Sequence, residues 1–193
     1  MTAALARLWR AFPWSPDAPA GQPFSSSYRP AQSGAGRFDL PRATHASAWY
    51  LAESPGHAIG ERLQDLRNRT LEPEDLEAAG HRLAVCEATV AVDAASGVVD
   101  LCDPAELVRY GIQPDWLAYR DRRVTQEISA RLHRSGHSGL RWWSALAGEW
   151  HTVVLFTDRL NESGLAFETP RLVSLDDEAL RSACDTLGIW ISR

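Results

Sequence analysis

The chain has 193 residues, of which 45% are hydrophobic and 23% are charged, and its formal net charge at pH 7 is −5. These values are typical of a globular protein, and we expect residues 1–193 to form one domain around one core. No segment concentrates positive charge and no apolar run is long enough to cross a bilayer, which argues against direct nucleic-acid binding and against a membrane protein. The opening MTAALARLWRAFPW also lacks the pattern of a signal peptide, so we expect a cytoplasmic protein.

The basic residues are all arginine, because the 20 Lys and Arg residues include no lysine. Codon bias explains this as readily as function does. Its chemical consequence is that every cationic side chain is a planar fork suited to carboxylate or phosphate, and that no lysine amine can form a Schiff base. Cys86, Cys102 and Cys184 lie far apart, and the six histidines lack metal-ligand spacing. We therefore expect buried, reduced thiols and no metal site.

The first half of the chain combines a long loop with a strand and a helix. Residues 13–36 are rich in Pro, Ser, Gly and Ala and predict a loop. The short apolar run 48–52 predicts a buried strand. Ser54 is a good N-cap and Pro55 a good first helical residue, and apolar residues then recur at helical spacing, which predicts a helix over 55–69.

The second half alternates irregularly between helices and strands. The expected elements are a short helix or turn over 71–82, a strand over 83–92, helices over 103–111 and 124–136, strands over 139–144 and 151–157, a further strand within 166–175, a helix over 177–187 capped by Asp176 or Asp177, and an edge strand over 189–192. Because regular βαβ alternation is missing, the pattern favours an α+β fold with a mixed sheet and flanking helices over a doubly wound parallel fold.

Three motifs contain four candidate functional residues. The segment GRF contains Arg37, WYLAESPGHAIGE contains Tyr50 and Glu61, and WWSA contains Ser144. These residues and motifs resemble the RES domain, the toxin family of bacterial toxin–antitoxin pairs whose antitoxins carry an Xre-type DNA-binding domain. The family is named after Arg, Glu and Ser, and the motifs follow the order of the family and span most of the chain.

The sequence also departs from the family pattern in three places. The link between Arg37 and Tyr50 is longer than usual. Asp39 follows GRF where an asparagine is common, and His151 stands where an asparagine is expected. We interpret His151 as a structural strand residue and not as a base.

The resemblance implies an ADP-ribosyltransferase-like fold and an enzyme that cleaves the nicotinamide–ribose bond of NAD by hydrolysis or phosphorolysis. NAD is then the substrate, no cofactor is required, growth arrest follows from NAD depletion, and an Xre-type antitoxin is the expected protein partner. Two alternatives remain open: an ADP-ribosyltransferase that modifies a protein, and a catalytically inactive partner-binding protein. The oligomeric state is open as well, with a homodimer among the alternatives.

The four residues suit this chemistry. Cleavage leaves an oxocarbenium-like ribose, which the Glu61 carboxylate can stabilise. Arg37 can grip phosphate oxygens with two N–H groups. Tyr50 offers a ring face to nicotinamide and a hydroxyl for a polar contact, while the Ser144 hydroxyl can bond to ribose or amide. Arg10 is a secondary candidate for binding NAD, although a surface role explains it equally well.

Each candidate also has a simpler explanation when it is considered alone. Arg37 fits a solvated loop arginine, Tyr50 a core aromatic residue, and Ser144 a turn residue. Glu61 lies roughly opposite the apolar stripe of its helix, where a solvated glutamate is ordinary. Only the ordered set favours the functional interpretation. Arg29 and Glu53 are the next candidates for the cation and the carboxylate.

Overall fold

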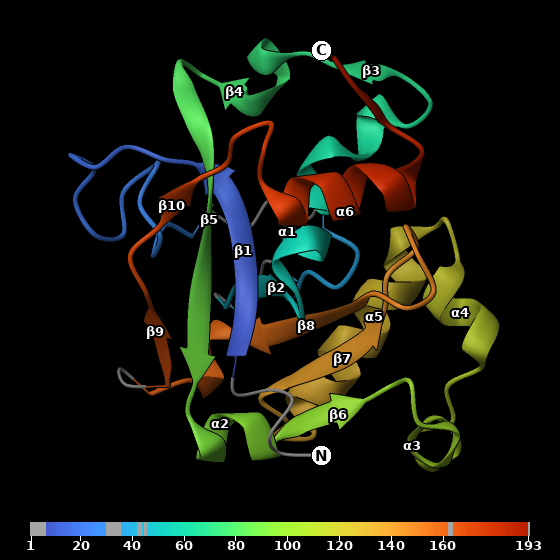
Figure 1. The fold of residues 1–193 in the computed structure, drawn as a ribbon. Coiled ribbons are helices and arrows are strands. Elements are labelled where there is room, and N and C mark those ends of the chain that lie inside the picture. The colour runs from blue at the N-terminus through green and yellow to red at the C-terminus, as the bar shows by residue number, and fades with distance from the viewer. Residues whose placement is uncertain (1–6, 30–35, 42–43, 45, 162–163, 193) are drawn as a thin grey trace.

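The computed structural model describes residues 7–29, 36–41, 44, 46–161 and 164–192 (Figure 1). The strands are β1 (Arg7–Pro13), β2 (Ala48–Ala52), β3 (Thr70–Leu71), β4 (Glu77–Ala78), β5 (His81–Val90), β6 (Val98–Asp100), β7 (Gly139–Trp143), β8 (His151–Phe156), β9 (Leu165–Phe167), β10 (Arg171–Leu172) and β11 (Trp190–Ile191). The α-helices are α1 (Pro55–Leu63), α2 (Val92–Ser96), α3 (Pro104–Arg109), α4 (Pro114–Ala118), α5 (Arg122–Arg134) and α6 (Glu178–Leu187). The 3₁₀ turns whose bounds lie within the described residues are η2 (Gln64–Leu66), η3 (Pro73–Leu76) and η4 (Thr157–Arg159).

Nine of the described strands form one sheet. Its main path runs β10-β5-β1-β2-β8-β7-β6, and β4 and β9 also pair with β5. Neighbouring strands are antiparallel except β6 and β7, which are parallel, and β3 and β11 form a separate parallel pair. The expected α+β class with a mixed sheet is therefore confirmed.

The sheet consists of two halves that meet between β1 and β2. In Figure 1, β1 and β5 run upright, whereas β7 and β8 run across the view. β1 pairs with β5 from Arg7 to Pro13. Along the described residues it is in register with β2 only where Trp9 faces Ala52. The two strands thus diverge on either side of this pair, and a pocket forms where they part.

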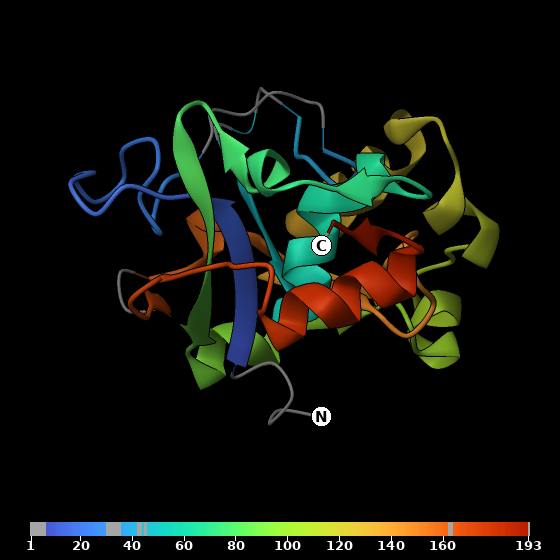
Figure 2. The ribbon, with the colours of Figure 1, turned by 45° about the horizontal axis from the view of Figure 1, so that its top comes forward.

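Helices cover the two halves separately. Ile59 and Leu63 of α1 share a buried apolar cluster with Leu180 and Leu187 of α6, and α6 lies across α1 (Figure 2). A second cluster joins α5 to β7 and β8, with Ile128 as one of its buried members. Since α1 and α5 flank the junction of the halves, their side chains reach the pocket from two sides.

Several elements differ from the sequence-based prediction, and α2, β6 and α4 were not expected at all. β1 was not expected, because its buried Leu8 and Phe12 alternate with an arginine. The predicted helix over 55–69 ends as an α-helix at Leu63 and continues as η2. The apolar spacing runs on to Leu66 because Leu66 still packs on the apolar cluster, although the backbone has tightened to a 3₁₀ turn. The segment 71–82 holds η3 between two short strands.

The remaining predictions for local structure are mostly confirmed. β10 and β9 both fall in or next to 166–175, where one strand was expected, and Asp177 caps α6. Residues 14–29 form turns without a helix or strand, and the rest of the predicted loop, 30–35, lies outside the described residues, as do residues 1–6. Cys102 is half-buried instead of buried. Within the described residues no helix is long and apolar enough to cross a membrane. That one domain spans residues 1–193 stays a prediction.

Candidate active site

A pocket of about 490 Å³ opens where β1 and β2 part. All five residues that the sequence singled out line it, namely Arg10, Arg37, Tyr50, Glu61 and Ser144. They come from β1, β2, α1, the segment before β2 and the end of β7, so the fold collects residues that are far apart in the chain. The volume of the pocket is in the range of sites for small organic ligands. The roles proposed for the five residues stay predictions.

Glu61 faces this pocket from the last turn of α1. The helix begins at the Ser54 cap, whose Oγ accepts a hydrogen bond from the His57 backbone N–H at 3.1 Å, and Pro55 follows the cap. Two turns later Glu61 lies off the buried stripe, with 41% of its side chain exposed. Its Oε1 is 2.9 Å from Ser144 Oγ and 3.0 Å from His57 Nε2. Among the described residues nothing bonds to Oε2, which leaves this oxygen for a ligand.

Ser144 is a partner of Glu61 in this structure. It is buried at the end of β7, and its Oγ accepts a hydrogen bond from the Leu146 N–H at 3.1 Å. The hydroxyl proton is therefore donated to Glu61. The Ser144 N–H donates to the carbonyl of Trp150 at 2.6 Å, which closes the loop between β7 and β8. The contact of this hydroxyl with ribose or amide stays a prediction, and in this structure the hydroxyl bonds to the Glu61 carboxylate.

Of the guanidinium groups that line the pocket, those of Arg37 and Arg10 bond to backbone carbonyls and have no carboxylate partner among the described residues. Arg37 Nη1 donates to the Tyr119 carbonyl at 2.7 Å, and its guanidinium lies 5.3 Å from the centre of the Trp142 ring. Burial, and then the charge of Arg122, lowers the pKa of Arg37, while Tyr50 and Glu61 raise it.

Arg10 is held by carbonyls as well. Its Nη1 donates to the carbonyls of Ser26 and Tyr28 at 2.6 and 2.9 Å. Burial lowers the pKa of Arg10 to about 10, so the side chain remains charged at neutral pH. Arg10 and Arg37 therefore place two positive charges at the pocket. No carboxylate among the described residues pairs with either of them, so an anionic ligand could.

Tyr50 contributes a ring to the pocket, while its hydroxyl is engaged within the protein. The hydroxyl donates to Asp39 Oδ1 at 2.9 Å and accepts from the Phe38 N–H at 2.9 Å. The other Asp39 oxygen accepts from the Gly36 N–H at 2.8 Å, so Asp39 orders the turn that carries Arg37. Burial, followed by the nearby Asp39 charge, raises the pKa of Tyr50 well above its usual value, and the hydroxyl stays neutral.

The pocket also contains polar residues that the sequence analysis did not single out. Among them are His57, Arg62 and Arg122. His57 stands four residues before Glu61 on one helix, and this spacing was the available signal, because such residues are neighbours on a helix surface. Arg122 begins α5, and no local pattern connects it with Glu61.

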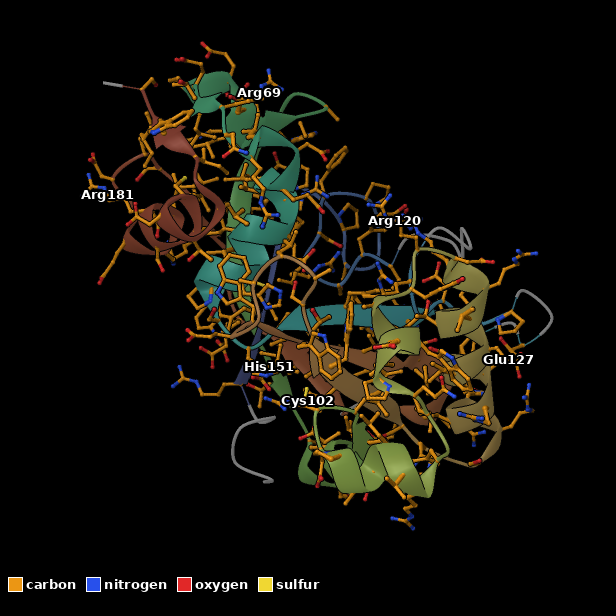
Figure 3. All side chains as sticks on the ribbon, turned by 90° about the vertical axis from the view of Figure 1, so that its right-hand side faces the viewer. Arg69, Cys102, Arg120, Glu127, His151 and Arg181 are labelled. Carbon is orange, nitrogen blue, oxygen red and sulfur yellow. The ribbon has the colours of Figure 1, made fainter. Side chains whose placement is uncertain are left out.

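The reserve candidates Glu53 and Arg29 lie outside the pocket lining. Glu53 Oε1 accepts from Arg141 Nε at 2.5 Å and its Oε2 lies 3.3 Å from His151 Nδ1. Arg141 Nη1 also donates to Asp100 at 3.1 Å. We call Glu53, Arg141, Asp100 and His151 the Arg141 cluster; Figure 3 labels His151, and Cys102 next to the cluster. His151 thus occupies a structural position on β8.

Among the described residues, no three His, Cys, Asp or Glu side chains gather in an arrangement that would hold a metal ion. The groups that line the pocket can instead bind an anion, stack on an aromatic ring and present one carboxylate oxygen.

Comparisons with known proteins agree with the motifs. The family described as the RES domain matches residues 7–176. Among solved structures, the fold is similar to a chain of the M. tuberculosis MbcT–MbcA toxin–antitoxin complex, with a TM-score of 0.59 and 18% sequence identity over 87% of this chain and 84% of that chain. At this identity the likeness concerns the fold alone, and it agrees with the expected α+β class. No curated protein matches the chain.

Proposed function

Because the chain belongs to the RES-domain family, whose profile matches residues 7–176, we propose that it cleaves the nicotinamide–ribose bond of NAD. The observation that carries the proposal is the division of charge in the pocket. One carboxylate, that of Glu61, presents a single oxygen, and Arg10 and Arg37 present guanidinium groups without carboxylate partners among the described residues. NAD has the complementary division, with a cationic nicotinamide end and an anionic pyrophosphate.

The reaction separates these charges further. The bond between ribose C1′ and the nicotinamide nitrogen breaks, and nicotinamide leaves with the electron pair as a neutral molecule. The ribose becomes oxocarbenium-like, and the Glu61 carboxylate stabilises that positive charge. Water or phosphate then attacks C1′. An attacking water releases one proton to the solvent, whereas an anionic phosphate oxygen forms the ester bond directly. The products are nicotinamide with ADP-ribose, or with its 1-phosphate ester.

The other pocket residues bind and orient the substrate in this proposal. Arg37, with Arg10 in support, holds the pyrophosphate, since planar guanidinium forks match phosphate oxygens. The Tyr50 ring offers a flat apolar face to the nicotinamide, since Tyr50 lines the pocket and is partly exposed. Ser144 acts through Glu61, because its hydroxyl bonds to that carboxylate at 2.9 Å.

We further propose that the protein is the toxin of a toxin–antitoxin pair. It would deplete NAD in the cytoplasm and arrest growth until an Xre-type antitoxin neutralises it. Membership of the RES family supports this role, and so does the similar fold of a chain from the MbcT–MbcA toxin–antitoxin complex.

The test is incubation of the purified protein with NAD, with and without inorganic phosphate, followed by separation of the products. We expect free nicotinamide without added metal, together with ADP-ribose in water or a phosphorylated product in phosphate. NAD that stays intact for hours with well-folded protein would refute the cleavage. Labelling of a protein from labelled NAD, with little free ADP-ribose, would instead identify the transferase alternative.

A further inference from the structure

His57 is a histidine of α1 that is only 1% exposed. Its backbone N–H bonds to the Ser54 cap, which fixes its place in the first turn of the helix. Its ring stacks on Trp150, with ring centres 5.0 Å apart and planes inclined by 23°. The imidazole is therefore held at the backbone and along one face.

The contact between His57 and Trp150 depends on a glycine. A Cβ on Gly60 would lie 2.6 Å from two ring atoms of Trp150, closer than side chains tolerate. Gly60 thus makes room for the indole, which lies in the loop between β7 and β8. The same loop carries Ser144, whose N–H donates to the Trp150 carbonyl. His57 and Ser144 therefore approach Glu61 from two elements that are fastened together by Trp150.

Both residues meet the same carboxylate oxygen. His57 Nε2 is 3.0 Å and Ser144 Oγ is 2.9 Å from Glu61 Oε1. The other ring nitrogen, His57 Nδ1, is buried and has no partner among the described residues. The neutral tautomer with its proton on Nε2 fits this arrangement, because it donates to Glu61 and leaves an acceptor, not an N–H donor, without a partner.

We propose that His57 is a positioning residue that, with Ser144, holds Glu61 through Oε1 and so directs Oε2 to the reacting ribose. The proposal rests on the proposed function. A carboxylate with a rotatable side chain loses much of its effect when it is displaced by about 1 Å, which can cost about 10²-fold in rate. The imidazole and the hydroxyl restrict that displacement because they hold Oε1 from two different elements.

The experiment compares two amides that differ in reach. In His57→Gln the amide nitrogen can occupy the place of Nε2 and donate to Glu61, whereas in His57→Asn it falls near Nδ1 and cannot. We expect His57→Asn to lower kcat for nicotinamide release by about tenfold or more with a smaller change in KM. His57→Gln should recover most of that loss. Equal kcat in His57→Asn and the wild type would overturn the proposal, and so would equal losses in the two variants.

A matched control is His133, a buried histidine of α5 whose Nε2 lies 2.8 Å from Asp158 Oδ2 outside the pocket. His133→Asn should change the thermal midpoint without changing kcat per folded molecule. If His133→Asn lowers kcat as much as His57→Asn does, the effect is general destabilisation and the proposal fails.

A second measurement does not depend on catalysis. ¹⁵N NMR of histidine-labelled protein should show His57 protonated on Nε2, with a signal that shifts in Glu61→Ala. An unprotonated Nε2, or a signal unaffected by Glu61→Ala, would overturn the proposal even if NAD is cleaved. Intact NAD with the expected signals would refute the proposed function and leave the His57–Glu61 interaction established.

Discussion

Two glutamates at opposite ends of α1 show how differently the same side chain is used. Glu53, just before the helix cap, is 22% exposed and bonds to Arg141 through both oxygens, at 2.5 and 3.1 Å. Glu61 is 41% exposed and is held through one oxygen by a hydroxyl and an imidazole. The charge of Glu53 is therefore neutralised by the Arg141 guanidinium, whereas the charge of Glu61 is not paired with an arginine and faces the pocket.

The contrast is sharper because cations are close to Glu61. Arg10, Arg37 and Arg62 line the same pocket, and none of these three forms an ion pair with Glu61 in the described structure. Opposite charges in one pocket lower their energy by forming an ion pair unless the fold holds them apart. Backbone carbonyls bind Arg10 and Arg37 and so keep their guanidinium groups from pairing with Glu61. A pocket that keeps both signs available suits a ligand that carries both.

The largest expected effect belongs to Glu61→Gln, which removes the charge and keeps the shape. Nicotinamide release should fall by about 10²-fold or more, as it does when one stabilising group is lost from a transition state. The free energy of unfolding should change by about 1 kcal/mol or less, because the Gln amide oxygen can still accept from Ser144 and His57 and only the charge assistance of these bonds is lost. Turnover and urea unfolding measure the two effects.

Glu127→Gln is the control for this substitution. Glu127 is an exposed glutamate on α5, paired with Arg134, and it does not line the pocket. Its variant should match the wild type in both measurements. Turnover near the wild-type value in Glu61→Gln would remove Glu61 from the mechanism and erase the difference between the two glutamates.

Arg37→Lys should have the next largest effect. Lysine keeps the charge but lacks the fork, so it cannot bond to the Tyr119 carbonyl and grip a phosphate with two parallel N–H groups. We expect kcat/KM for NAD to fall about tenfold, the value of one charge-assisted hydrogen bond. Arg123→Lys is the control, because Arg123 is exposed and pairs with Asp121. Full activity in Arg37→Lys would shift phosphate binding to Arg10.

The motifs in the sequence were sufficient to predict which residues meet in the pocket, but not what holds them. Glu61 was correctly placed off the apolar stripe of its helix. Its bond to Ser144 joins residues 83 positions apart, and no local pattern reports such a contact. β1 was missed for a related reason: Arg10 interrupts its apolar pattern, and the carbonyls that accept from Arg10 come from the loop after the strand.

Glu53→Gln tests whether Glu53, in contrast to Glu61, serves stability and not catalysis. Arg141 would lose one of its two carboxylate partners, while Asp100 remains at 3.1 Å. The Glu53 bond raises the pKa of Arg141 more than any other contact, so the loss should be felt in stability. We expect the free energy of unfolding in urea to fall by about 1–2 kcal/mol, with unchanged nicotinamide release per folded molecule. A large loss of turnover without a loss of stability would place Glu53 in the mechanism.

The smallest effect is expected at Tyr50, a residue of the pocket whose hydroxyl is as fully engaged within the protein as the Glu53 carboxylate is. Tyr50→Phe keeps the ring and removes the bonds to Asp39 and the Phe38 N–H. Stability should fall by about 1 kcal/mol, and kcat/KM should fall less than in Arg37→Lys.

The pH dependence separates the two roles of the Tyr50 hydroxyl, in stability and in substrate binding. Because the pKa of Tyr50 is raised in the fold, the unfolded chain loses this proton first, near pH 10. Wild-type stability should therefore decline more steeply than that of Tyr50→Phe as the pH rises above about 10. Parallel stability curves in that range, with a large loss of turnover at neutral pH, would show that the hydroxyl serves the substrate and not the fold.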